Sequence, residues 1–348
     1  MEAGYKHVET GDLVLSGMNA HLGGIGVTPC DGRMSPVYVV LRPGSAIDVR
    51  YLAHHLRHIG VSGGLVVLSR SIRFNSADLS FDKIRSLPVL VPPLGEQRAI
   101  ADYLDTETAR IDALITQKRR LITLLEEQQE ALLLREIGDW RCGANRTLRQ
   151  YGTNVLTGPF GTVLAASEYI DGGIPLVNPT HIKAGRVVPE EGVGVSEQVA
   201  NRIARHRLSK GDIVMGRKGD VGRSAVITER EDGWVCGSDS IAIRCSAYLE
   251  PEFLAAALRI GLYRQQLERT STGAMVLNVN EGILLGLLLP SATREEQRQS
   301  VVGAHRVLDR HASLRSNMSR QLDLLVEHRQ ALITAAVTGE LRVPGVAA

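Results

Sequence analysis

The residues best suited to chemistry in this sequence are basic and lie close together in its second half. Between Arg202 and Arg223, seven arginines and lysines stand against two aspartates, a local excess of five positive charges. Arg217 and Lys218 lie between two β-rich runs, at the expected tip of a hairpin. Long basic side chains at a loop tip can reach phosphates or a guanine edge. The stretch therefore predicts contact with nucleic acid, although the same charges would also suit an ordinary solvated surface.

Polar residues elsewhere in the second half could complete such a surface. Asn278 and Asn280 follow a Thr/Ser-rich loop, and asparagine can pair with adenine through two hydrogen bonds. The same residue types also form ordinary turns and helix caps. Phe160 could equally be a core residue. The candidate contacts in this half are Phe160, Lys183, Arg217, Lys218, Arg223, Thr272, Asn278 and Asn280.

The first half offers fewer basic candidates. The segment 16–19 aligns with the basic tip 216–219 but carries no charge, so it does not repeat the basic loop. The better candidates are Arg70, Arg73 and Asn75. Different residues at equivalent loops would suit two different half-sites, but neutral drift would leave the same pattern.

No constellation of catalytic or metal-binding residues is found. His54 and His58 have a spacing of four that could bind a metal, but no third ligand is evident. The four cysteines form no CxxC pair, which fits a reduced, cytoplasmic protein. The longest apolar run, 283–289, is far shorter than the ~20 residues that span a bilayer. We therefore expect no catalytic residues, no metal, no cofactor bound by this chain and no membrane contact.

The elements that would position these residues are organised around two long helices. From Glu96 to Glu136 the chain contains no glycine or proline. Apolar residues recur there at sevenfold spacing, with two leucines at the second seam position and with Lys118 and Gln128 as the polar interruptions. This pattern predicts a helix that buries one stripe against a partner helix. A second copy of the pattern follows 200 residues later, from Glu295 to Ile333, so the partner is expected within the same chain.

The two helices are expected to pack as an antiparallel coiled coil with a pseudo-twofold internal repeat. A charge buried in that interface would be costly, so aspartate at Leu114 or Leu314 is expected to break the pair. The predicted interface residues are Leu104, Ile111, Leu114, Leu121, Leu125, Leu132, Val307, Leu314, Met318, Leu325 and Leu332.

The repeat extends into the globular segments. The sequence at 11–14 matches that at 211–214, and 52–57 lines up with 254–259 after a slip of two residues. Short strands mixed with helices, without strict alternation, favour an α+β fold. The expected division is a first module at 1–86, a helix segment at 87–142, a second module at 143–286 and a second helix segment at 287–343. The first module lacks a counterpart of about 148–200, so it is expected to be partial.

These features together resemble a known family. A proline-bearing strand, a GEQR or EEQR helix start and a long helix ending in QxALI occur twice, each after an α+β module. The segments 156–164 (LTGPFGTVL), 169–182 (YIDGGIPLVNPTHI) and 331–341 (ALITAAVTGEL) have the same resemblance. The chain resembles the specificity subunit of type I restriction–modification systems over essentially its whole length.

The resemblance implies a non-catalytic, DNA-binding subunit. Each module would be a target recognition domain that reads one half of a bipartite sequence in double-stranded DNA, with the helices as the spacer between them. Two methyltransferase subunits would carry S-adenosylmethionine and methylate adenine N6. Added restriction and translocase subunits would cleave unmodified DNA.

Two alternatives stay open at this point. A truncated or decayed specificity subunit could act only as a scaffold that binds methyltransferase but not DNA. Alternatively, two copies of the chain could pair through their second halves. The reduced first module is the sequence feature that favours both alternatives.

Overall fold

The computed structural model describes residues 5–65, 81–190, 192–219, 221–270 and 278–344. The fold is α+β, as predicted. The chain forms two compact units: residues 1–122 with 316–348, and residues 123–315. Each unit thus contains one globular module and one segment from each long helix.

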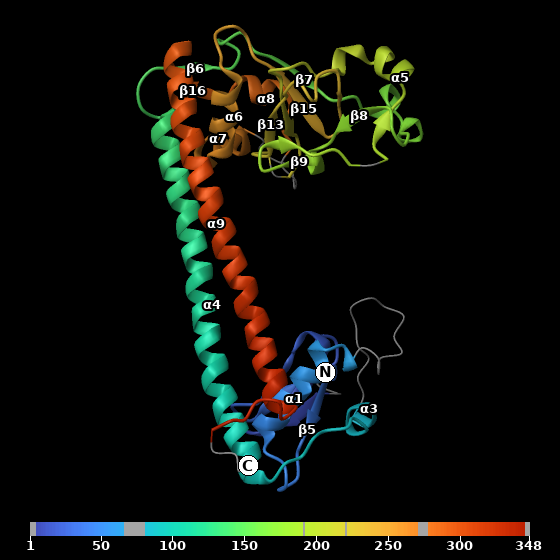
Figure 1. Ribbon diagram of the computed structural model, residues 1–348. Helices are drawn as coiled ribbons and strands as arrows, with labels where there is room; N and C mark the ends of the chain where they lie inside the picture. Colours follow the sequence, from blue (N-terminus) through green and yellow to red (C-terminus); the bar gives the residue numbers. More distant parts are fainter. Residues whose placement is uncertain (1–4, 66–80, 191, 220, 271–277, 345–348) are drawn as a thin grey trace. The chain divides into compact units, whose positions relative to one another are not determined.

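The second unit is built on a four-stranded antiparallel sheet in the order β13-β12-β15-β7 (Figure 1). Successive residues of β12 face two different cores. Ile213 and Met215 pack with α6, whereas Val214 packs with Ala225 and Ala242 on the opposite face. Both faces are therefore buried, which explains why β12 carries no polar side chain. The elements are β7 (Asn154–Thr157), β12 (Ile213–Gly216), β13 (Ser224–Val226), β15 (Ser240–Arg244) and α6 (Pro251–Arg259).

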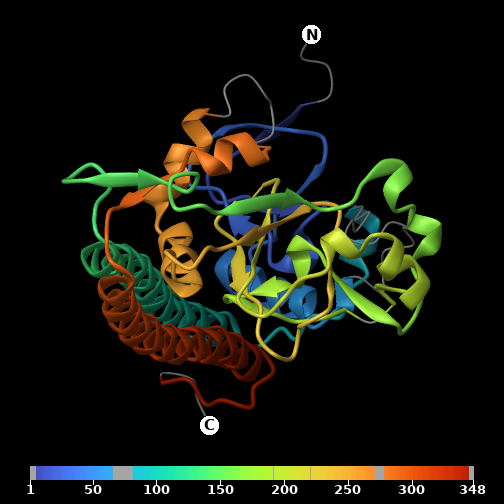
Figure 2. The ribbon, with the colours of Figure 1, turned by 90° about the horizontal axis from the view of Figure 1, so that it is seen from above.

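Smaller strands and helices complete the second unit. Figure 2 shows the ribbon from above. A three-stranded sheet has the order β11-β8-β14, and two further strand pairs are β9 with β10 and β6 with β16. The strands are β6 (Asn145–Thr147), β8 (Ile174–Val177), β9 (Ile182–Lys183), β10 (Arg186–Val187), β11 (Gly194–Val195), β14 (Val235–Cys236) and β16 (Leu288–Pro290). The helices are α5 (Glu197–Arg202), α7 (Gly261–Thr270) and α8 (Glu281–Leu285).

The first unit contains a reduced version of the same sheet, in the order β3-β2-β5. In β2, Leu13 lies between Val27 and Leu41, just as Ile213 of β12 lies between Val226 and Ile243. Among the described residues of this unit, no strand pairs with β5 as β7 pairs with β15. The elements are β1 (Lys6–Val8), β2 (Leu13–Ser16), β3 (Ile25–Val27), β4 (Gly32–Met34), β5 (Tyr38–Leu41), α1 (Val49–Val61) and α3 (Phe81–Arg85).

The repeated Gly-Asp sequence forms the same turn in both modules. The buried carboxylate of Asp12 accepts hydrogen bonds from the Glu9 amide and from Arg42, both at 2.9 Å. Asp212 accepts from the Ser209 amide at 2.9 Å, but Arg244 lies 3.6 Å away. Burial raises the pKa of Asp212. Burial would also raise the pKa of Asp12, but the closer arginine and the amide lower it below its usual value.

The two long helices are α4 (Leu94–Ile137) and α9 (Arg294–Val337), each of 44 residues. They run antiparallel in each unit, where polar pairs join them. In the first unit Lys118 donates to Gln321 at 2.7 Å, and Arg329 pairs with Asp112 at 2.9 Å. In the second unit Arg315 lies 3.7 Å from Glu126.

The buried stripe on α4 differs from the predicted one. Leu114 and Leu121 are 46% and 45% exposed, whereas Ile115 is 7% exposed. Leu314 is likewise 39% exposed, so these three residues do not belong to the stripe as predicted. In a heptad, the second buried residue follows the first after three or four positions. The prediction took the spacing of three, from Ile111 to Leu114, whereas the structure buries the residue four positions on, Ile115. The other predicted interface residues are buried (Leu104, Ile111, Val307) or half-buried (Leu125, Leu132, Met318, Leu325, Leu332).

Each long helix is joined to its module by a buried glutamine near its start. The side-chain oxygen of Gln97 accepts from the Asp48 amide at 2.9 Å, and its nitrogen donates to the carbonyls of Ala46 and Pro92. Gln297 makes the same three bonds, to the Glu250 amide and to the carbonyls of Tyr248 and Ala292. The repeated EQR sequence is thus explained by this contact.

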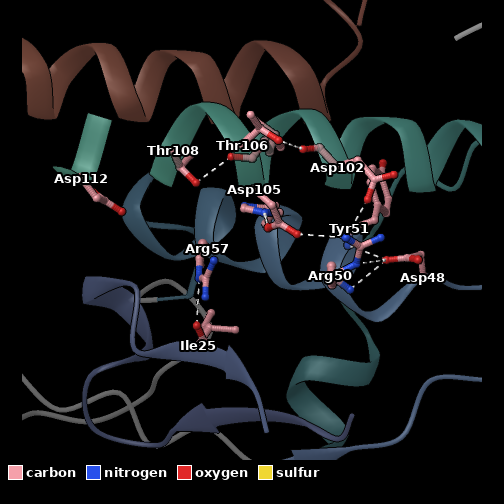
Figure 3. A network of polar contacts seen from close by, with 12 residues as sticks. Ile25, Asp48, Arg50, Tyr51, Arg57, Asp102, Asp105, Thr106, Thr108 and Asp112 are labelled. Atoms are coloured by element: carbon pink, nitrogen blue, oxygen red, sulfur yellow. Dashed lines mark hydrogen bonds and ion pairs between the residues drawn. The ribbon is translucent and has the colours of Figure 1, made fainter. Parts of the chain in front are cut away.

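Polar contacts also connect α1 with α4 in the first unit (Figure 3). Arg50 forms ion pairs with Asp102 at 2.7 Å and with Asp105 at 3.1 Å. The buried His54 lies 2.8 Å from the other oxygen of Asp105. Burial lowers the pKa of His54, although the hydrogen bond to Asp105 opposes that shift.

Candidate functional site

Four of the residues predicted to contact nucleic acid come together at one end of the four-stranded sheet: Phe160, Arg217, Lys218 and Asn278. Arg217 directly follows β12, and Phe160 lies shortly after β7. Arg217 donates its backbone amide to the Asp239 carbonyl at 3.0 Å and accepts from the Val279 amide at 2.9 Å. An isolated antiparallel β-bridge pairs the backbone of Lys218 with that of Asn278. Three segments far apart in sequence therefore meet here, and we call these four residues the Arg217 cluster.

The guanidinium of Arg217 is held on two sides. Its Nε donates to the side-chain oxygen of Asn278 at 3.0 Å. Its central carbon lies 5.9 Å from the centre of the Phe160 ring, within the range of a cation–π contact. Phe160, which the sequence left open as a core or a surface residue, is 63% exposed and therefore lies at the surface. The arrangement presents an oriented cation and an aromatic face to the solvent.

Lys218 has a carboxylate partner that the sequence interpretation missed. Its ammonium lies 3.0 Å from the Asp239 carboxylate. Asp239 lies in the short segment between β14 and β15, 21 residues beyond Lys218. No motif in the sequence marks such a partner, because only the pairing of β12 with β15 brings the two residues together.

Most of the basic stretch around Arg217 is neutralised locally. Each of several members pairs with a carboxylate: Arg202 with Glu168, Arg207 with Glu197, and Lys210 with Glu229. Arg205 donates to the His206 ring. The excess of positive charge in the sequence is therefore not a continuous basic surface, and Arg217 is distinguished by having a ring and a neutral amide as its partners.

The remaining candidates lie elsewhere in the second unit. Asn280 caps α8, because its side chain accepts from the Ile283 amide at 2.9 Å. The structure thus assigns it the capping role rather than a free side chain. Arg223 donates to the Pro179 carbonyl at 3.5 Å, and Lys183 is exposed on the short strand β9.

Four predicted residues, Thr272, Arg70, Arg73 and Asn75, lie outside the described residues. The counterpart of the basic tip in the first module is described. There, Gly17 donates to the Val37 carbonyl, as Arg217 donates to that of Asp239. The backbone arrangement of the tip is thus repeated in the first module without its charged side chains.

The two histidines considered as metal ligands have structural partners. His54 pairs with Asp105, and His58 Nδ1 lies 2.9 Å from the Thr334 hydroxyl. Within the described ranges there is no cluster of three or more His, Cys, Asp or Glu side chains arranged to hold a metal. In that part of the chain no helix is long and apolar enough to cross a membrane.

Comparisons with known proteins agree with the resemblance drawn from the sequence. No family model matches the chain. The chain is 25% identical over 178 residues to the specificity subunit of the type I restriction enzyme StySPI from Salmonella potsdam, covering 49% of this chain and 37% of that protein. It is 22% identical over 275 residues to the EcoBI specificity subunit from Escherichia coli, covering 72% of this chain and 58% of that one. Thus the curated homologues are type I restriction enzyme specificity subunits, and the chain matches between about a third and three fifths of their length.

Solved structures share the fold. One is a chain from a structure of the type I R-M system solved to explain its complex assembly and conformational transition. It has a TM-score of 0.79 at 17% identity and covers 98% of this chain and 85% of that one. The HsdS subunit from Thermoanaerobacter tengcongensis has a TM-score of 0.52 at 18% identity over 98% of this chain and 84% of that subunit.

Proposed function

We propose that this chain is the sequence-specific DNA-recognition subunit of a type I restriction–modification complex. It reads a bipartite DNA site and positions methyltransferase subunits for adenine N6 methylation. The observation that carries the proposal is the duplication: two modules with matching strand register, each joined to a 44-residue helix by the same buried glutamine. A duplicated pair of readers in one chain is suited to the two half-sites of a bipartite sequence.

The Arg217 cluster supports DNA contact in the second module. It combines an oriented guanidinium, an ammonium, an amide and an exposed aromatic ring on loops at the end of a sheet. Loops held by a rigid scaffold are common binding sites. The chemistry of methyl transfer, with S-adenosylmethionine, and the chemistry of restriction belong to partner subunits in this proposal.

The long helices supply a surface on which those partners can dock. Exposed leucines lie outside the buried stripe in both units. Leu114, Leu121 and Leu324 belong to the first unit, and Leu124 and Leu314 belong to the second. Leu114 repeats as Leu314 and Leu124 as Leu324, so related surfaces are available to two copies of one methyltransferase.

Mapping of methylated adenines tests the proposal. Genomic DNA from the host would be compared with DNA from a strain that lacks this chain. We expect methylation at a bipartite sequence to be present in the first and absent in the second. Identical methylation in the two strains, with the modification subunits expressed in both, would refute the proposal.

The reduced sheet of the first module supports a second candidate function. In the described residues β5 lacks the neighbour that β15 has in β7, and the tip at 16–19 is uncharged. A chain whose first module does not read DNA could serve only as a scaffold for methyltransferase, or could pair with a second copy through its second half. A gel-shift assay with and without the modification subunits separates these functions, because a scaffold would assemble without shifting any DNA.

A further inference from the structure

We propose that Arg217 reads a guanine in the half-site contacted by the second module, and that Asn278 and Phe160 orient its guanidinium for this contact. The inference deepens the proposed function and rests on it. Its basis is the set of partners that Arg217 has among the described residues, which hold the side chain in place without neutralising its charge.

The orientation of the guanidinium is suited to one base in particular. Because Nε donates to Asn278, the two terminal nitrogens at the far end of the fork are directed away from that bond. A pair of parallel donors matches the O6 and N7 acceptors that guanine presents in the major groove. Such a two-bond contact discriminates among bases, whereas a single donor does not.

Asn278 has a different role here from the one its residue type suggests. To pair with adenine, an asparagine must offer both its oxygen and its nitrogen to the base. The oxygen of Asn278 already accepts from Arg217 at 3.0 Å. Asn278 is therefore a positioning residue that acts through Arg217.

A phosphate contact would explain these features less well. Phosphate affinity depends mainly on accumulated positive charge, and the second cation of the cluster is offset by a carboxylate. Lys218, the other cation of the cluster, pairs with Asp239 at 3.0 Å. A cation stacked on an exposed ring and fixed at Nε has lost conformational freedom, which favours a directional contact.

Selection from a pool of randomised DNA duplexes tests the inference. The full chain, assembled with the modification subunits of its host, would be used to recover bound duplexes for sequencing. With the natural protein we expect an enriched bipartite motif that contains a G·C pair contacted by the second module. In Arg217→Lys, which retains the charge and loses the fork, preference at that pair should fall roughly tenfold or more, while the other positions remain unchanged.

Two further variants sharpen the result. Asn278→Ala should relax the same position by a smaller factor, and the double variant should be no worse than Arg217→Lys alone, because both changes act on one contact. Lys210→Ala removes a charge from the same module and should leave the motif unchanged.

The outcomes separate the two claims. If Arg217→Lys weakens binding equally at every position, or has no effect, the guanine assignment is overturned and the proposed function is retained. If Lys210→Ala relaxes the same base pair, the assignment is also overturned. If the natural complex enriches no motif, both the assignment and the proposed function are overturned.

Discussion

Gln97 and Gln297 show how one neutral side chain can join a long helix to a globular module. Both are fully buried, and each uses its amide oxygen and nitrogen in three hydrogen bonds to backbone groups. One of these bonds is accepted from the amide of the residue that precedes α1 or α6. A buried polar group is tolerated only when such bonds are made, and then it specifies a single arrangement.

Replacing Gln97 with leucine should therefore destabilise the first unit. The change preserves the approximate size but leaves the Asp48 amide and two carbonyls without their partner. At about 1 kcal/mol for each hydrogen bond, the free energy of unfolding should fall by about 2–4 kcal/mol. Urea denaturation followed by circular dichroism would measure this. Gln117→Leu, on an exposed position of the same helix, is the control, and equal stability of the two variants would contradict the prediction.

At the scale of elements, the long helices present two faces with different roles. One stripe on α4 is buried, including Leu104, Thr108, Ile111 and Ile115, whereas Leu114 and Leu121 point outward. Adjacent positions along α4 can thus affect either the pairing of the helices or the surface they present to partners.

Aspartate at Ile115 and aspartate at Leu114 should have opposite consequences. Ile115→Asp places a charge in the helix interface and should lower the melting temperature strongly. Leu114→Asp changes an exposed position and should leave the melting temperature nearly unchanged, while weakening binding of the methyltransferase subunit. Thermal melting of both variants and a pull-down with the modification subunit measure the two effects. A larger loss of stability in Leu114→Asp would show that the assignment of the two faces is wrong.

At the scale of the whole molecule, the two halves share a plan but differ in detail. The contact between each module and its helix exchanges acidic and basic residue types: Arg50 pairs with Asp105 in the first half, whereas Glu252 lies 3.7 Å from His305 in the second. The segment before each long helix accepts a hydrogen bond from a tyrosine hydroxyl: Tyr51 donates to the Leu90 carbonyl, and Tyr151 donates to the Pro290 carbonyl.

Tyr151 lies in a segment that has no counterpart within residues 1–86, and Tyr51 makes the corresponding hydrogen bond in the first module. The equivalent of Tyr51 in the second module is Phe253, which has no hydroxyl. The smaller module therefore makes this contact with a residue of its own rather than losing it.

The polar pairs between the helices favour pairing within one chain over pairing of two second halves. By the 200-residue repeat, the α9 counterparts of Asp112 and Glu126 are Ala312 and Val326. In a pair of two α9 helices, Arg329 and Arg315 would therefore face residues without a carboxylate. Exposed ion pairs contribute less than about 1 kcal/mol each. The high effective concentration of two helices in one chain also favours pairing within the chain.

We accordingly expect one copy of this chain in each assembled complex. Native mass spectrometry of the complex with its modification subunits would measure the copy number. The double variant Asp112→Ala with Glu126→Val, which gives α4 the residues of α9, should weaken the preference for pairing within the chain. Two copies in the natural complex would instead support the dimeric alternative.

The sequence by itself determined the features that depend on period and repetition. These are the two long helices, the α+β class, the duplication and the basic tip at Arg217, because spacing and self-similarity are written directly in the residue order. Only the tertiary structure decided which leucines are buried, since heptad spacings of three and four are both compatible with the pattern. It also decided that Asp239 neutralises Lys218 and that Asn278 orients Arg217. Those partners are remote in sequence: the pairing of β12 with β15 brings Asp239 to Lys218, and the bridge between Lys218 and Asn278 brings Asn278 to Arg217.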